Sequence, residues 1–399
     1  MRRKTTMLLG TTAALALVLT ACAGEGAGSD SGNGADDGAD TDNGADVEAD
    51  ADADTGDLTA GVAMPTQTYE RWLNDGAAVE EGLQDLGYQV DLQFADDDIP
   101  TQSQQIDQMI TQEVDVLIIA SIDGSALTSQ IDAAAAAGIP VIAYDRLLMN
   151  SDEVDFYVTF DNYEVGVNQA NALLYGLGIL DENFEEASDA PDETLNVELF
   201  AGSLDDNNAH LFWDGAIDTL QPYLDDGTIN VPSDQMDINQ AATQRWEQET
   251  AQERMENLIT AHYAGDEELH GVLAPADPLS RGIINALQNA GWPTTIDEGL
   301  PVVTGQDAEI ATVSLIADGV QHSTIFKDTR LLAEEAVTAA QAFLDGSEPE
   351  ANDTETYDNG EIIVPSYLLE VEMVLQDNFE EILVDSGYYT EEQVESGQL

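Results

Sequence analysis

Residues 114–146 read VDVLIIASIDGSALTSQIDAAAAAGIPVIAYDR, and this stretch decides the fold. Val114 to Ala120 is a short continuous apolar run, which predicts a buried strand. Ser125 to Ala137 is predicted to be a helix that ends at Gly138, and Val141 to Tyr144 is predicted to be a second buried strand. A strand, a helix and a strand in this order form a βαβ unit. The two strands are therefore expected to be parallel, in a sheet covered on both faces.

The same alternation continues in both directions from this stretch. Around it, strands are predicted at 58–64, 89–94 and 157–160 and helices at 71–86 and 101–111. A second series follows, with strands predicted at 195–200, 228–231, 270–274, 300–304 and 323–326 and helices at 208–220, 248–261, 278–290, 310–318 and 331–344. Residues 362–369 are predicted to be extended and to cross to the C-terminal tail. Two α/β units in series predict two lobes, each with its own sheet.

The composition excludes several classes of partner. The chain has 399 residues, of which 43% are hydrophobic, and this is enough for two domains. Its 80 Asp and Glu against 10 Lys and Arg give a formal charge of -70. Nucleic acid and anionic membrane surfaces both need a basic footprint, so neither is an expected partner. Such a surplus of carboxylates indicates adaptation to high salt, which screens repulsion. The alternative is an acidic protein from an ordinary habitat.

The first residues form a targeting signal. Arg2, Arg3 and Lys4 precede the apolar run Met7 to Leu19, which is shorter than the ~20 residues of a spanning helix. The run ends in Leu19-Thr20-Ala21-Cys22, which resembles the lipidation site of bacterial lipoproteins. Residues 1–22 are therefore predicted to be a lipoprotein signal in which Cys22 is lipidated. The alternative is a secreted protein, and export by the Sec or the twin-arginine route stays open.

Residues 23–57 consist mainly of Gly, Ala, Asp, Ser and Asn. Such a composition cannot bury apolar surface, so it predicts a disordered acidic linker. The folded part is then expected on the extracellular face of the cell membrane or in the periplasm, attached by the lipid anchor. Because Cys22 is the single cysteine, no intramolecular disulfide and no cysteine-based zinc site is expected.

Polar and aromatic residues follow the predicted strands of both units. Ligands of open α/β sheets bind at the carboxyl ends of the strands, so these segments are the candidates for a site. They lie at 64–66, 70–72, 144–146, 202–208, 244–246, 275–277, 305–307 and 326–328. Three of the ten basic residues precede Met7, and four of the other seven fall in these segments: Arg71, Arg146, Arg245 and Lys327.

These residue types suit a sugar. Asp accepts hydrogen bonds from hydroxyl groups, whereas Arg, Asn and Lys donate to hydroxyl and ring oxygens. The flat C–H faces of a pyranose pack on indole rings, so Trp72 and Trp246 are predicted to clamp the ring from opposite sides. A lone loop Asp is more often a cap, and a lone Arg more often forms a structural ion pair, so the set as a whole carries the prediction.

Enzyme interpretations are weaker. Paired carboxylates can serve a glycoside hydrolase, but carboxylate spacing carries no weight in a chain with 80 acidic residues. The sequence has no glycine-rich phosphate loop, no G-x-S-x-G and no H-E-x-x-H. The four His are scattered, so no metal site and no cofactor is expected.

At the strand ends the sequence resembles the periplasmic sugar-binding proteins of ABC transporters with the type I fold, in particular the xylose-binding and ChvE-like multiple-monosaccharide branch. The resemblance covers about residues 60–390. It is carried by MPTQTYERW, QFADDDIPTQSQQIDQMI, IIASIDG, IPVIAYDR, FDNYEVG, LFAGSLDDNNAHLF, GQDAE, STIFKDTR and VPSYLL. It implies two Rossmann-like α/β lobes joined by three crossing strands. The first lobe would hold 58–161 and 328–364, and the second 162–327 and 365–399.

The resemblance also implies which residues meet the ligand. These are Arg71, Trp72, Asp145 and Arg146 from the first lobe, Asp206, Asn208, Trp246, Asp277 and Asp307 from the second, and Lys327 at the hinge. Ala276 precedes Asp277 where the xylose branch has Asn, which leaves the identity of the sugar open. Arg245 beside Trp246 favours the multiple-sugar branch.

The function that the resemblance implies is capture of a monosaccharide such as xylose, glucose, galactose or arabinose. The lobes would close on the sugar, and the closed monomer would deliver it to the permease subunits of an ABC importer without catalysing a reaction. Two alternatives stay open. The protein can present its sugar to a membrane sensor, or it can be an anchored glycoside hydrolase.

Overall fold

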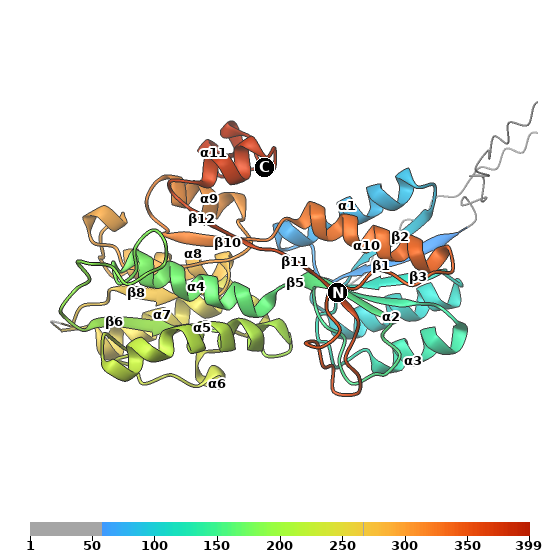
Figure 1. Ribbon diagram of the computed structural model, residues 1–399, viewed down its shortest axis with the longest axis horizontal. Coiled ribbons are helices and arrows are strands. Elements are labelled where there is room, and N and C mark those ends of the chain that lie inside the picture. The colour runs from blue at the N-terminus through green and yellow to red at the C-terminus, as the bar shows by residue number, and fades with distance from the viewer. Residues whose placement is uncertain (1–57, 266) are drawn as a thin grey trace, which may run out of the picture. The chain divides into compact units, whose positions relative to one another are not determined.

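A six-stranded sheet forms the centre of the part of the chain that we call the first lobe (Figure 1). The computed structural model describes residues 58–265 and 267–399, so the predicted signal with Cys22 and all of the predicted linker lie outside the described residues. The strands lie in the order β11-β5-β4-β3-β1-β2, and each neighbouring pair is parallel, as predicted. They are β1 (Thr59–Met64), β2 (Gln89–Phe94), β3 (Val116–Ile119), β4 (Val141–Tyr144), β5 (Phe156–Phe160) and β11 (Ser366–Leu369).

Helices cover both faces of this sheet. The alternation of side chains along β3 shows why: Val116 and Ile118 pack into one core cluster, and Leu117 and Ile119 into another. The helices of the first cluster are α1 (Glu70–Asp85) and α10 (Thr329–Leu344). Those of the second cluster are α2 (Ile99–Thr111) and α3 (Thr128–Ala137). Because both faces are buried, β3 is a continuous apolar run rather than an alternating one.

The second lobe is built on a four-stranded parallel sheet with the order β7-β6-β8-β9. Its strands are β6 (Leu195–Leu199), β7 (Ile229–Asn230), β8 (Gly271–Leu273) and β9 (Val302–Val303). Its helices are α4 (Asn162–Gly176), α5 (Asn208–Asp226), α6 (Ile238–Ala241), α7 (Gln248–His262), α8 (Asp277–Asn289) and α9 (Ile310–Ala317). A separate antiparallel pair joins β10 (Ser323–Phe326) to β12 (Glu372–Leu375), and the chain ends with a π-helix (Glu380–Asp385) and α11 (Glu391–Ser396).

Three segments connect the lobes. The chain passes from β5 to α4 near Asp161, from β10 to α10 near Lys327, and from β11 to β12 near Glu370. The two parallel sheets and these connections agree with the predicted fold class. The predicted lobe boundaries stay a prediction; β11 begins two residues after the predicted boundary at 364 and pairs with β5 of the first lobe.

Helix α4 was not predicted from the sequence. It packs closely on α5, and its buried residues include the polar Asn162 and Gln169. A Cβ on Gly166 would lie 2.1 Å from the carbonyl oxygen of Phe212, so the two helices approach backbone to backbone. A helix buried on several sides, with small residues at its contacts, has no clear apolar stripe.

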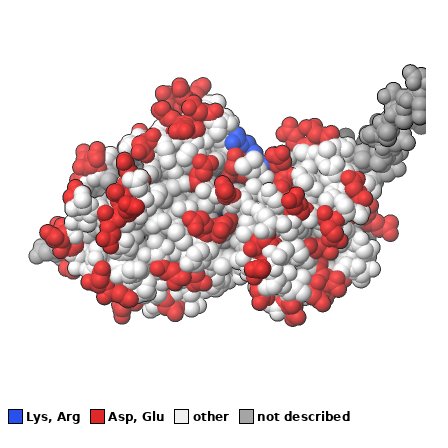
Figure 2. All heavy atoms as spheres, in the orientation of Figure 1, with Lys and Arg blue, Asp and Glu red and all other residues white. Residues whose placement is uncertain are grey.

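Acidic side chains cover the surface. Figure 2 shows Asp and Glu spread over one face of the molecule, with very few Lys or Arg. Within residues 58–265 and 267–399, no helix has both the length and the apolar character needed to cross a bilayer.

Candidate ligand-binding site

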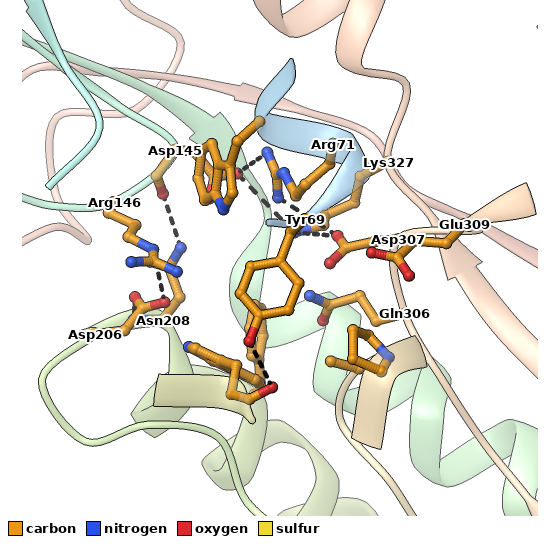
Figure 3. Close-up of a pocket in the computed structure, with 15 residues that line it drawn as sticks. Tyr69, Arg71, Asp145, Arg146, Asp206, Asn208, Gln306, Asp307, Glu309 and Lys327 are labelled. Carbon is orange, nitrogen blue, oxygen red and sulfur yellow. Dashed lines mark hydrogen bonds and ion pairs between the residues drawn. The ribbon is translucent and has the colours of Figure 1, made fainter. Parts of the chain in front are cut away.

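A pocket lies where the segments after β1, β4, β6, β7, β8 and β9 meet the hinge segment after β10 (Figure 3). Its empty space, which includes open solvent at its mouth, is about 470 Å³. Nine of the ten predicted ligand contacts line it, and the exception is Asp277. The lining residues are Tyr69, Arg71, Trp72, Asp145, Arg146, Asp206, Asn208, Phe212, Trp246, Ala276, Pro278, Gln306, Asp307, Glu309 and Lys327.

Arg71, in the first turn of α1, is held by three carboxylates. Its Nε donates to Oδ2 of Asp75 at 3.1 Å, its Nη2 to Oδ2 of Asp145 at 2.9 Å, and its Nη1 to Oδ1 of Asp307 at 3.4 Å. Burial lowers the pKa of Arg71, but the three carboxylates outweigh the effect of burial. The pKa of Arg71 is therefore raised well above its usual value. A guanidinium has five N–H groups, so one on each Nη is left for a ligand.

Asp145 directly follows β4 and is 3% exposed. Burial raises the pKa of this carboxyl group, but Arg71, Lys327 and Arg146 together outweigh burial and hold the pKa below its usual value. The carboxylate is therefore charged at neutral pH. Its main-chain carbonyl accepts hydrogen bonds from Nδ2 of Asn208 at 2.7 Å and from the hydroxyl of Tyr157 at 2.6 Å, which joins the loop after β4 to the start of α5.

Arg146 and Asp206 form a second ion pair between the lobes. Nε of Arg146 lies 3.1 Å from Oδ2 of Asp206, and both side chains are mostly buried. Burial raises the pKa of Asp206, and Arg146 opposes that rise. The guanidinium groups of Arg71 and Arg146 both stack on the indole of Trp72, at 4.3 and 5.0 Å from the ring centre. These contacts fix the ring in the pocket wall.

Lys327 lies in the hinge segment and is 2% exposed. Its Nζ is 2.9 Å from Oδ1 of Asp307 and 3.9 Å from Oδ2 of Asp145, so it bridges carboxylates of the two lobes. Both Asp residues have left-handed backbones, with φ of 60° at Asp145 and 89° at Asp307. Strained backbone of this kind persists where the surrounding structure enforces it, often at ligand sites.

Aromatic rings complete the wall. Trp246 packs edge-to-face with Phe212 at 6.2 Å, and its buried Nε1 has no hydrogen-bond partner among the described residues. The Tyr69 hydroxyl donates to the main-chain oxygens of Arg245 and Trp246, each at 3.2 Å. In Figure 3, Tyr69 lies between Arg146, Asp206 and Asn208 on one side and Gln306, Asp307 and Glu309 on the other. Whether Trp72 and Trp246 clamp a sugar from opposite sides stays a prediction.

Asp277 lies behind the wall of the pocket. It is fully buried, and its carboxylate accepts from the backbone N–H groups of Gln306 and Glu309 and from the hydroxyl of Thr324. Burial raises its pKa well above the usual value. These bonds hold the loop that carries Asp307, so they indicate a positioning role, and direct contact with the ligand stays a prediction.

The ligand contacts predicted from the sequence did not include several lining residues, among them Tyr69, Phe212, Gln306 and Glu309. Tyr69 directly precedes Glu70-Arg71-Trp72, and Gln306 directly precedes Asp307. Phe212 lies four residues after Asn208 on the same helix, so helical spacing could have identified it. Glu309 pairs with Arg281 at the edge of the pocket, a contact that no local pattern indicates.

The charges of the pocket balance. Three cations, Arg71, Arg146 and Lys327, face three carboxylates, Asp145, Asp206 and Asp307. The fourth carboxylate of the lining, Glu309, pairs with Arg281. A charged ligand would find no unpaired counter-charge among them, whereas a neutral polar ligand can use their remaining donors and acceptors. Within the described chain, no cluster of His, Cys, Asp and Glu has a geometry that could hold a metal ion.

Comparisons with known proteins point to one family. The model of a family described as periplasmic binding protein domain matches residues 60–348. The multiple sugar-binding periplasmic receptor ChvE of Rhizobium radiobacter is 48% identical over 342 residues, which cover 86% of this chain and 93% of that protein.

Solved structures give the same result. An ABC transporter solute-binding protein from Clostridium phytofermentans with bound β-D-glucose aligns with a TM-score of 0.78 at 44% identity, over 84% of this chain and 99% of that one. A carbohydrate transporter solute-binding protein from Chloroflexus aurantiacus in complex with D-glucose aligns with a TM-score of 0.74 at 36% identity, over 84% and 98% of the two chains. These matches confirm the resemblance and the fold class predicted from the sequence.

Proposed function

Because this chain belongs to the periplasmic binding protein family, we propose that it captures a neutral monosaccharide outside the cytoplasm and delivers it to an ABC importer. It is a binding protein and catalyses no reaction. One observation carries the proposal: the pocket combines paired charges of both signs with aromatic rings. Hydroxyl groups use both donors and acceptors, and the C–H faces of a pyranose use the rings.

Glucose is the first sugar to test. The two solved relatives described above hold glucose, and ChvE is named for binding several sugars. The ten predicted contacts remain our proposal for the site, with nine in direct reach of the sugar and Asp277 supporting the loop of Asp307. Galactose, xylose and arabinose are further candidates, because Ala276 removes a polar group that the xylose branch carries at this position.

The proposed mechanism is closure of the two lobes on the sugar. Arg71, Trp72, Asp145 and Arg146 belong to the first lobe, and the carboxylates of Asp206 and Asp307 to the second. A sugar that bonds to both sets stabilises the form in which they meet, by the difference in its affinity for the two forms. The permease then receives the closed monomer.

The location and the anchor rest on the sequence. We propose that Cys22 carries a lipid, that residues 23–57 tether the folded part, and that the lobes lie on the outer face of the membrane or in the periplasm. We also propose that the acidic surface is an adaptation to high salt. Mass spectrometry of the mature N-terminus tests the anchor, because an unmodified N-terminus after residue 22 contradicts it.

A sensory role is the second candidate, because the similar ChvE protein is named as a receptor. A single protein can serve both roles. Co-purification of the sugar-loaded protein with its permease, compared with co-purification with a membrane sensor, separates them.

Calorimetric titration with D-glucose, D-galactose, D-xylose and L-arabinose tests the proposed function. We expect saturable binding of at least one aldose with one site per chain. Incubation with oligosaccharides, followed by chromatography, is expected to give no product. Release of a monosaccharide would favour the anchored hydrolase, and absence of binding to every aldose would contradict the proposal.

A further inference from the structure

Tyr389, near the C-terminus, contacts both halves of the pocket without lining it. Its hydroxyl lies 2.9 Å from Oε1 of Glu70 and 3.0 Å from the main-chain oxygen of Ala308. Glu70 is the first residue of α1 and directly precedes Arg71. Ala308 directly follows Asp307. A single hydroxyl therefore joins the segments that carry the two facing charges of the site.

The ring of Tyr389 is fixed in the second lobe. It is 5% exposed and packs in a core cluster with Ala308 and Ile310. It also packs edge-to-face on Tyr388 at 4.8 Å, and Tyr388 packs in the same way on Phe326 at 4.7 Å. The hydroxyl is thus held on a rigid support, and Glu70 is its contact in the first lobe.

The hydroxyl has one proton and two acceptors within reach. Burial, together with the nearby Tyr388 and Glu70, raises the pKa of Tyr389 far above its usual value, so the group remains a donor at neutral pH. A hydrogen bond to a carboxylate is stronger than one between neutral groups. The carbonyl of Ala308 belongs to a residue with φ of 47°, next to Asp307 with φ of 89°, so the second contact supports strained backbone.

We propose that Tyr389 is a positioning residue for ligand binding, whose hydroxyl holds the start of α1 against the Asp307 loop once a sugar is bound. This inference rests on the proposed function. A positioning role differs from a purely structural role in one respect. The Tyr389 hydroxyl stabilises the sugar-bound form more than the sugar-free form. Loss of the hydroxyl then speeds release of the sugar.

Tyr389→Phe keeps the ring and removes the hydroxyl. We expect the dissociation constant for the tightest-binding aldose of the panel to rise about tenfold, mostly through a faster dissociation rate in stopped-flow fluorescence. Tyr263→Phe is the matched control: Tyr263 is also 5% exposed and donates to a buried glutamate, Glu198, but it contacts neither α1 nor the Asp307 loop. Its affinity is expected to match the wild type.

A double-mutant cycle tests the route through Glu70. If the hydroxyl acts on Glu70, Glu70→Ala weakens binding in the wild type but has little further effect in Tyr389→Phe. Fully additive effects, or an unchanged affinity in Tyr389→Phe, overturn the inference. Equal losses of unfolding free energy with and without sugar also overturn it, because they indicate a structural role. If the wild type binds no aldose, the proposed function fails first and this inference with it.

Discussion

Arg71 and Asp307 contact each other across the pocket, with Nη1 of the arginine 3.4 Å from Oδ1 of the aspartate. They are 236 residues apart in the chain and belong to different lobes. Lys327, from the hinge, also contacts the carboxylate of Asp307 at 2.9 Å. The contact thus joins both lobes and the hinge at one oxygen atom of Asp307.

Asp307→Asn is predicted to abolish most sugar binding. Asn tolerates the left-handed backbone of this position, so the change removes the charge without new strain. Removing the charge of one member of such a buried set typically weakens the free energy of binding by ~2–5 kcal/mol. This corresponds to a loss of affinity of roughly 30-fold or more. Titration calorimetry measures it.

The control for this charge change is Asp318→Asn. Asp318 is an exposed residue at the C-terminus of α9 and does not line the candidate pocket. It is expected to bind sugar as the wild type does. Normal binding by Asp307→Asn, with folding confirmed by circular dichroism, would place the site elsewhere.

The sequence predicted most of the strands and helices because the local hydrophobic pattern alone was enough to identify them. Strands β2, β4 and β10 have the predicted bounds. Helix α4 was missed because its contacts with α5 use Gly166 and buried polar groups, so tertiary packing and not an apolar stripe stabilises it. The short antiparallel partner β12 was also missed, since its pairing with β10 depends on residues far away in the chain.

The location of the candidate pocket was predictable from the sequence, and the directions of its side chains were less so. Position at a strand end identifies the loops that meet, and nine of the ten residues line the pocket. Position does not fix the direction of a side chain. Asp277 lies at a strand end, but its carboxylate turns back to accept the backbone N–H groups of Gln306 and Glu309. The carboxylate takes this direction because backbone N–H groups in another loop need an acceptor. No local sequence pattern indicates this need.

Gly202→Ala is predicted to weaken sugar binding without adding a group to the pocket. A Cβ at this position would lie 2.0 Å from the indole of Trp246, so the ring must move. A displaced aromatic anchor typically weakens binding by ~2 kcal/mol or more, a loss of affinity of roughly 30-fold or more. Gly265→Ala is the control, because a Cβ there has no atom within 4 Å. Equal affinities of the two variants in titration calorimetry would contradict a role for the indole.

Asp75 is predicted to make stability depend on pH. Its complete burial raises the pKa from the usual 3.8 to about 6, although Arg71 and Tyr144 oppose the rise. The folded state therefore binds a proton more tightly than the unfolded state. This contribution is present at low pH and is lost as the pH rises through about 6.

Asp75→Asn, a neutral group of the same shape, removes this contribution. The unfolding free energy of the wild type relative to the variant is expected to fall by roughly 1 kcal/mol between about pH 5 and pH 7. Urea unfolding at several pH values measures the difference, and shifts from other carboxylates cancel between the two proteins. A difference that stays constant, or grows with pH, would mean that the pKa of Asp75 is not raised.

The acidic surface is predicted to make the folded state depend on salt. The formal charge of -70 is carried mainly by exposed carboxylates that repel one another, and folding brings them closer together. Dilution from about 1 M to about 0.1 M KCl lengthens the screening distance from about 3 Å to about 10 Å, so repulsion then reaches several neighbours. We expect Tm to fall by roughly 5 °C or more.

Sucrose separates screening from solvent exclusion, since both salt and sucrose can stabilise compact states but only ions screen charge. At about 0.1 M KCl, sucrose is expected to restore only part of the lost Tm, whereas returning KCl restores all of it. The tethered and the untethered protein, with and without residues 23–57, are expected to respond alike if the folded surface carries the effect. A Tm that does not change with KCl would show that repulsion between the carboxylates does not destabilise the folded state at low salt. That result would contradict the high-salt interpretation.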